Sequence, residues 1–161
     1  MQSTDVAALS AMIAKSYTSL ESDSALLAGL THSIGLSPIL VKAEGDSNLL
    51  NDTQALDNLI YDLYPVVGAE ILKNWGFSEH LIQVPAQHLN LERTGNNGKA
   101  DYTDIVQVAL IQTVAGTSHP LACVGQENVS ALDRLSMRGS VEEIDMAGGI
   151  IEVEEIREAI L

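Results

Sequence analysis

The spacing of apolar residues is the feature that most limits how this chain can fold. Along most of the sequence they recur every three or four residues, which is the period of amphipathic helices, whereas half-buried strands alternate every two. Because no segment has a convincing strand pattern, we expect an all-α bundle of about eight helices. The stripe in residues 4–20 is an example, formed by Val6, Leu9, Ile13 and Tyr17.

One predicted helix belongs at the centre of this bundle. Residues 105–115 are apolar around nearly the whole circumference, which is typical of a helix enclosed by other elements. Asp101 is well placed to cap this helix, and Asp52 lies at the corresponding point ahead of a helix expected over residues 53–63. Asp104 is interpreted as a residue that stabilises the start of the central helix.

Proline and glycine predict where other helices begin and end. Pro65 is expected to open a separate helix, because proline suits the first helical turn. Gly76 is expected to follow the C-terminus of that helix in a left-handed conformation. Trp75 is assigned to the core because its spacing from Ile71 and Leu72 places the three side chains on one side.

Smaller features complete the local prediction. Gly68 is expected to let two helices approach closely, since it has no side chain to separate them. Residues 121–124 are predicted to be a short extended piece, and residues 129–137 to be helical. Ser140 and Glu143 have the spacing of a capping box and would start a further short helix.

Acidic residues far outnumber basic ones. The 161 residues include 22 acids and 8 lysines and arginines, so the net charge is −14. Such a field repels phosphate backbones and anionic lipids, so we expect no nucleic-acid partner and no membrane partner. Residues 141–161 hold seven of these acids and one arginine, and are predicted to expose an acidic face with a final helix over 152–161.

Cysteine content and hydropathy indicate the compartment. The single cysteine, Cys123, rules out a disulfide framework and a multi-cysteine zinc site, and it fits a reducing cytosol. We expect its side chain to be a small buried hydrophobe. Neither a secretory leader nor an apolar run of the roughly 20 residues that span a bilayer is apparent. The prediction is one cytoplasmic domain over residues 1–161.

Two sequence blocks resemble one known family. Residues 28–35 read Ala-Gly-Leu-Thr-His-Ser-Ile-Gly, which resembles the A-G-L-x-H-D-I-G motif of the HD superfamily of metal-dependent phosphohydrolases. Residues 67–82, followed by His88, resemble a second block of the same superfamily. The pair is typical of the HDOD branch, which comprises helical output modules of bacterial signalling proteins. The resemblance covers a core of about residues 7–115 and implies an HD-like bundle, with 116–161 as an acidic C-terminal segment.

The chain departs from the enzymes of that superfamily at their metal ligands. The resemblance implies an upstream histidine, an adjacent His-Asp pair and a distal aspartate. Here His32 is present, but Ser33 replaces the aspartate, and a neutral hydroxyl cannot supply the charge that holds a catalytic metal. The upstream region, residues 2–7, has no histidine, and the helix of the distal aspartate reads Val-Ala-Leu-Ile over 108–111.

We therefore expect no catalytic residue, no cofactor and no metal. His32 and His88 are the vestigial metal-capable positions, and His32, Ser33 and Gly35 form a degenerate motif. His32 has two open interpretations: a relic ligand or an anion-binding group in a shallow pocket, or a partly buried histidine that bonds the backbone at a helix junction. The same two interpretations apply to His88. His80 is expected at the surface and His119 in a loop.

The leading hypothesis is a non-catalytic bacterial regulatory module that acts through protein–protein interaction. Its partner would be a signalling domain such as a receiver. A homodimer is the other option, because apolar surface on the first helices would need cover. One alternative is an HD-like metal-dependent phosphohydrolase with an atypical metal site. The other alternative is a small-ligand sensor that uses the vestigial pocket near His32. Side chains that fill this pocket would exclude the sensor hypothesis.

Overall fold

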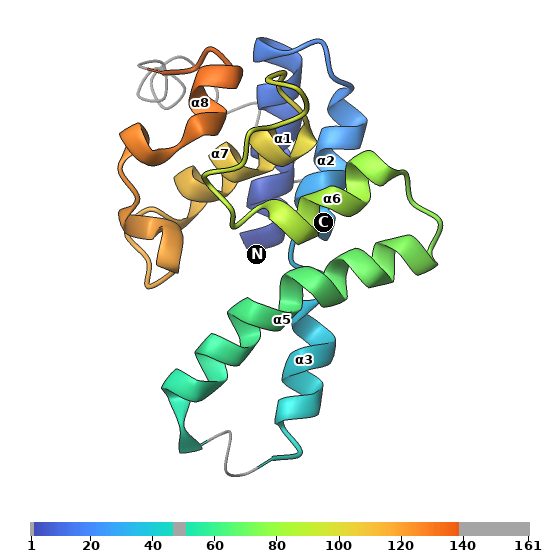
Figure 1. The fold of residues 1–161 in the computed structure, drawn as a ribbon, viewed down its shortest axis with the longest axis vertical. Helices are drawn as coiled ribbons and strands as arrows, with labels where there is room; N and C mark the ends of the chain where they lie inside the picture. Colours follow the sequence, from blue (N-terminus) through green and yellow to red (C-terminus); the bar gives the residue numbers. More distant parts are fainter. Residues whose placement is uncertain (1, 47–50, 139–161) are drawn as a thin grey trace.

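Helices make up the fold, as the computed structural model shows for residues 2–46 and 51–138 (Figure 1). No strand occurs within these ranges, so the all-α prediction is confirmed. The described chain holds seven α-helices, where about eight were expected. The predicted capping box at Ser140 and the predicted helix over 152–161 lie outside the described residues. The helices are α1 (Gln2–Tyr17), α2 (Ser22–Thr31), α3 (Leu36–Ala43), α5 (Thr53–Asn74), α6 (Glu79–Gln87), α7 (Tyr102–Val114) and α8 (Ser130–Arg134).

The central position of α7 is confirmed. Every residue from 103 to 110 is buried, and α1, α2, α6 and α8 all pack against this helix. Its start is fixed by a capping box, in which the Asp101 side chain accepts from the backbone N–H of Asp104 at 3.1 Å and Asp104 accepts in return. Asp52 caps α5 by accepting from the N–H of Ala55 at 3.0 Å. Both predicted caps are therefore confirmed.

The α2–α3 junction crosses α5 at two glycines. A Cβ atom on Gly35 would overlap the backbone carbonyl oxygen of Tyr64 and would lie 2.6 Å from the nitrogen of Gly68. A Cβ atom on Gly68 would in turn lie 2.9 Å from Cβ of Pro85 in α6. The close helix approach expected at Gly68 is therefore confirmed. The α2–α3 junction, which carries the degenerate motif, packs directly against α5.

Two local predictions about α5 and its end are wrong, whereas the left-handed conformation expected at Gly76 is confirmed. Pro65 does not begin a helix, because α5 runs unbroken from residue 53 to 74. A proline inside a helix costs about 3 kcal/mol, and here Tyr64, Pro65 and Gly68 are all buried, so tertiary packing holds the helix together. Trp75 is 63% exposed rather than in the core, since α5 ends there and Gly76 turns the chain with φ +77°.

The segment after α7 also differs from prediction. Residues 120–123 form a 3-10 helix, Pro120–Cys123, instead of an extended piece, and a second one follows at Gln126–Asn128. Only Leu121 of the first turn is buried, which leaves Cys123 exposed rather than in the core. The helix predicted over 129–137 is shorter and spans residues 130–134.

One segment is apolar enough to cross a membrane by length and composition, contrary to the sequence prediction. It is Ser22–Ala43, with a mean hydropathy of 1.5. In the structure this segment is two helices, α2 and α3, separated by a turn at residues 32–35, and α2 packs against α1 and α7. A core helix meets the same criteria, so the finding is weak evidence for a membrane span.

Candidate functional site

The degenerate motif opens onto a pocket between α1, the α2–α3 junction, α5 and α7. Its volume is about 280 Å³. A second, more open hollow of about 440 Å³ shares Tyr61 and His119 with it, so the two are neighbouring parts of one depression. The pocket is lined by Ser3, His32, Ser33, Leu36, Ile60, Tyr61, Tyr64, Leu110 and His119.

His32 is almost fully buried at 3% exposure. Its Nδ1 lies 2.6 Å from the carbonyl oxygen of Gly29, and since a carbonyl only accepts, Nδ1 carries the proton and donates. Burial lowers the pKa of His32 to about 4, the bond to Gly29 opposes this shift, and the charge of His119 adds to it. His32 is therefore neutral at pH 7, with the lone pair on Nε2.

His88 uses both ring nitrogens within the protein. Nδ1 donates to the carbonyl oxygens of Val84 and Pro85, at 3.1 and 2.9 Å, and Nε2 accepts from the Tyr64 hydroxyl at 2.8 Å. The side chain is fully buried, and burial first, then the charge of His32, lowers its pKa to about 3. Burial likewise raises the pKa of Tyr64, which keeps this phenol protonated as the donor.

The other positions implied by the resemblance hold side chains that are poor metal ligands. The Ser33 hydroxyl lies 3.0 Å from that of Ser3, which belongs to the region expected to hold the upstream histidine. Leu110, from the stretch expected to hold the distal aspartate, lines the pocket with its aliphatic side chain. Imidazoles and neutral hydroxyls without a carboxylate do not fit a hard catalytic cation. Within the described ranges, no group of three or more His, Cys, Asp or Glu could hold a metal ion.

The remaining histidines are placed differently. His80 is exposed near the start of α6, away from the pocket. His119 does more than lie in a loop, because it caps the Pro120–Cys123 turn: its Nδ1 accepts from the N–H of Leu121 at 3.1 Å. It also stands edge-on to the ring of Tyr61, with centroids 5.9 Å apart. Sequence reasoning missed both residues as pocket walls, since 58 positions separate them in the chain.

A second cluster missed from the sequence is a buried ion network. Asp104, described above as a helix-start residue, also receives hydrogen bonds from the guanidinium groups of Arg93, at 2.5 Å, and Arg134, at 2.7 and 2.9 Å. Arg93 pairs with Asp101 as well. The Asp104 side chain is completely buried, so this network ties the loop before α7 and the α8 turn to the core helix.

The buried histidines predict that the protein loses stability in mild acid. Both pKa values are lowered by folding, so the unfolded chain binds more protons once the pH falls below about 6.5. The free energy of unfolding should therefore decrease from pH 7 towards pH 4, by up to about 1.4 kcal/mol per pH unit for each histidine. Urea denaturation at several pH values measures this slope. A His88→Gln variant should have a shallower slope, and His80→Gln should keep the wild-type slope; equal slopes in all three proteins would contradict this assignment.

Comparisons with known proteins agree with this architecture. The HDOD domain model matches residues 1–91. A solved structure from Shewanella amazonensis, described as a candidate metal-dependent phosphohydrolase, superposes with a TM-score of 0.74 and 24% sequence identity. The alignment covers 98% of this chain and 55% of the other, so this chain spans about half the length of that protein. Comparison with curated proteins gave no match. On the evidence of the family match and the HD-like fold, this chain belongs to the HDOD domain family.

Proposed function

We propose that this chain is a non-catalytic regulatory module of bacterial signalling that works in the cytoplasm by binding a partner protein. The observation that carries the proposal is where apolar side chains are exposed. In the part of the chain that the structure describes, the large hydrophobic residues exposed by more than a third all lie on α3, on α5 or at the end of α5. They are Leu40, Val41, Leu59, Leu63, Val66 and Trp75.

Five of these residues lie on one part of the fold, and Trp75 lies beyond it at the end of α5. Figure 1 shows α3 and the first half of α5 projecting from the body as a helical hairpin, which we call the arm (residues 36–46 and 51–66). Leu59, Leu63 and Val66 follow at spacings of four and three, so they share one face of α5. Val66 is 61% exposed. An apolar stripe of this kind on a projecting element is typical of a protein interaction site.

The charge around the stripe indicates the chemistry of the partner. Residues 36–74 hold six acids and only two lysines, and one of these, Lys73, lies 3.8 Å from Glu70. Asp62 lies within the stripe's length, and Asp52 precedes it. Two copies of the arm would bring like charges together, which disfavours self-association. We therefore commit to an amphipathic helix with an apolar face and basic flanks as the partner element.

The chemistry of the pocket supports the non-catalytic part of the proposal. An HD-type hydrolase needs anionic oxygen ligands to hold its metal, and the pocket offers Ser33 and Leu110 at two of the positions concerned. No described residue supplies a carboxylate to its lining. The alternative of an enzyme with an atypical metal site gains no support from this donor set.

Two designed peptides test the interaction. Both carry the same apolar helical face, one flanked by lysine and arginine and the other by glutamate, and calorimetry measures their binding. The basic peptide is expected to bind at least tenfold more tightly, with a salt dependence, because the arm is acidic. The Leu63→Ser, Val66→Ser double variant should lose binding, whereas Ala86→Ser, an exposed position on α6, should retain it.

Other outcomes would contradict the proposal. The arm would not be a site for a basic helix if neither peptide bound, if both peptides bound equally, or if the double variant bound as the wild type does. Self-association seen in analytical ultracentrifugation and abolished by the double variant would instead show that a second copy covers the arm.

A further inference from the structure

The two histidines that line the pocket carry their ring protons on opposite nitrogens. His32 donates through Nδ1 to Gly29, which leaves Nε2 as an acceptor. His119 accepts through Nδ1 from the Leu121 N–H, which places its proton on Nε2 as a donor. The tautomer of each ring is thus fixed by a backbone group on the side away from the free nitrogen.

We propose that this pocket binds a small neutral molecule that carries a hydrogen-bond donor beside an acceptor, such as a lactam or a nucleobase. The molecule donates to Nε2 of His32 and accepts from Nε2–H of His119. Both imidazoles belong to one lining. This inference does not depend on partner binding at the arm, although Leu36, Ile60, Tyr61 and Tyr64 belong to both the arm and the pocket lining.

Within the described ranges, the pocket lining has no basic residue that would offset a ligand's negative charge. Neither lysine nor arginine is among the described residues that line the pocket or the neighbouring hollow. The chain as a whole carries −14, so a phosphate or carboxylate would be repelled. None of the described residues that line the pocket offers a carboxylate to a cation. Burial of an uncompensated charge is costly, so the ligand is neutral.

Size and wall chemistry fit a small ring. A volume of about 280 Å³ lies just below the range of ordinary ligand pockets, about 300–1,000 Å³. Leu36, Ile60 and Leu110 supply apolar walls, and the rings of Tyr61 and Tyr64 complete them. His32 is itself buried to more than nine-tenths, and a donor on the ligand would satisfy its Nε2 acceptor.

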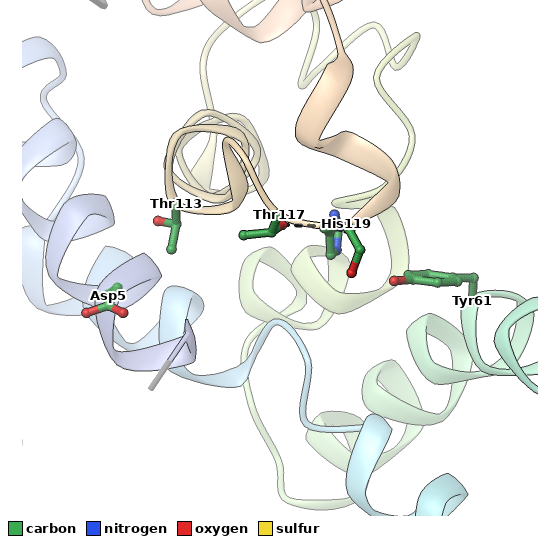
Figure 2. Close-up of a pocket in the computed structure, with 6 residues that line it drawn as sticks. Asp5, Tyr61, Thr113, Thr117 and His119 are labelled. Atoms are coloured by element: carbon green, nitrogen blue, oxygen red, sulfur yellow. Dashed lines mark hydrogen bonds between the residues drawn. The ribbon is translucent and has the colours of Figure 1, made fainter. Parts of the chain in front are cut away.

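The neighbouring hollow gives the pocket an open, polar side. Figure 2 shows the Tyr61 hydroxyl directed towards the segment that carries Thr117 and His119, with Thr113 on the adjoining helix. The backbone N–H of His119 donates to the Thr117 hydroxyl at 3.2 Å, which orders this segment beside the opening. Most residues that line this hollow carry hydroxyl groups. The hollow would therefore accommodate an uncharged polar substituent on the ligand's ring.

Three probes test the proposal by NMR of the histidine ring nitrogens. 2-Pyridone carries a donor beside an acceptor, N-methyl-2-pyridone has the same ring without the donor, and inorganic phosphate is the charged comparison. In the free protein, His32 should show an unprotonated Nε2 and His119 an unprotonated Nδ1. Millimolar 2-pyridone should move the His32 Nε2 resonance towards that of a hydrogen-bonded nitrogen, and the other two probes should leave it unchanged.

Variants separate the pocket from general surface effects. His119→Phe keeps a ring beside Tyr61 but removes the donor, and should weaken 2-pyridone binding at least tenfold. His80→Phe, on an exposed position outside the pocket, should bind as the wild type does. The proposal is overturned if His32 carries its proton on Nε2, if no probe moves its resonance, if N-methyl-2-pyridone or phosphate acts equally, or if His119→Phe binds normally.

Discussion

Replacing Gly35 by alanine is expected to destabilise the protein by about 3 kcal/mol or more, at the upper end of what overpacking costs. The added methyl group would meet the backbone of α5 at Tyr64 and Gly68, not the end of a flexible side chain. Backbone atoms can move aside only if the α2–α3 junction separates from α5. This separation would also displace Tyr64, and with it the hydrogen bond from its hydroxyl to His88.

A second glycine in the same region provides the matched control. A Cβ atom on Gly45, just after α3, would lie 3.5 Å from the carbonyl oxygen of Lys42, which is ordinary contact. Gly45→Ala should therefore leave the urea midpoint close to that of the wild type. Circular dichroism during urea denaturation measures both variants. A Gly35→Ala protein as stable as Gly45→Ala would show that α2, α3 and α5 are not packed as described.

Replacing Asp104 by asparagine is expected to cost about 3–5 kcal/mol of stability, the range found when one partner of a buried ion pair is removed. The change keeps the shape of the side chain but removes the charge between two guanidinium groups. The side chains of Arg93 and Arg134 are only 6% and 10% exposed, so water cannot replace the lost carboxylate. The network links α7 to the loop before it and to α8, so these parts should unfold first.

The exposed pair between Asp133 and Arg138 is the control for this variant. Its side chains are 62% and 42% exposed, so solvent already screens their attraction. Asp133→Asn should therefore leave the thermal midpoint nearly unchanged. If Asp104→Asn lowered the midpoint no more than Asp133→Asn, the buried network would not be a main source of stability.

Local patterns explain which parts of the fold were predictable. The caps at Asp52 and Asp101 depend on residues three positions away, and the burial of α7 follows from its own composition. The unbroken course of α5 was not predictable from Pro65, because distant packing outweighs the local penalty. Trp75 was wrongly assigned to the core because helical spacing does not predict side-chain direction beyond the end of a helix, and α5 ends at Asn74.

The candidate site was only partly predictable for the same reason. The resemblance directed attention to His32, Ser33 and His88, since these lie within continuous sequence blocks. The partners that fix the site lie far away in the chain: Tyr64 is 24 residues from His88, and Ser3 is 30 residues from Ser33. No local pattern could join them without the fold.

Metal content tests most directly whether the pocket at His32 holds a catalytic metal, and we expect that it does not. The purified protein is incubated with excess manganese, iron, nickel or zinc, desalted and measured by plasma mass spectrometry, beside His32→Ala and the surface variant His80→Ala. Far less than one equivalent of any metal is expected in all three proteins. One equivalent that is retained in wild type and His80→Ala but lost in His32→Ala would contradict the non-catalytic role and restore the phosphohydrolase hypothesis.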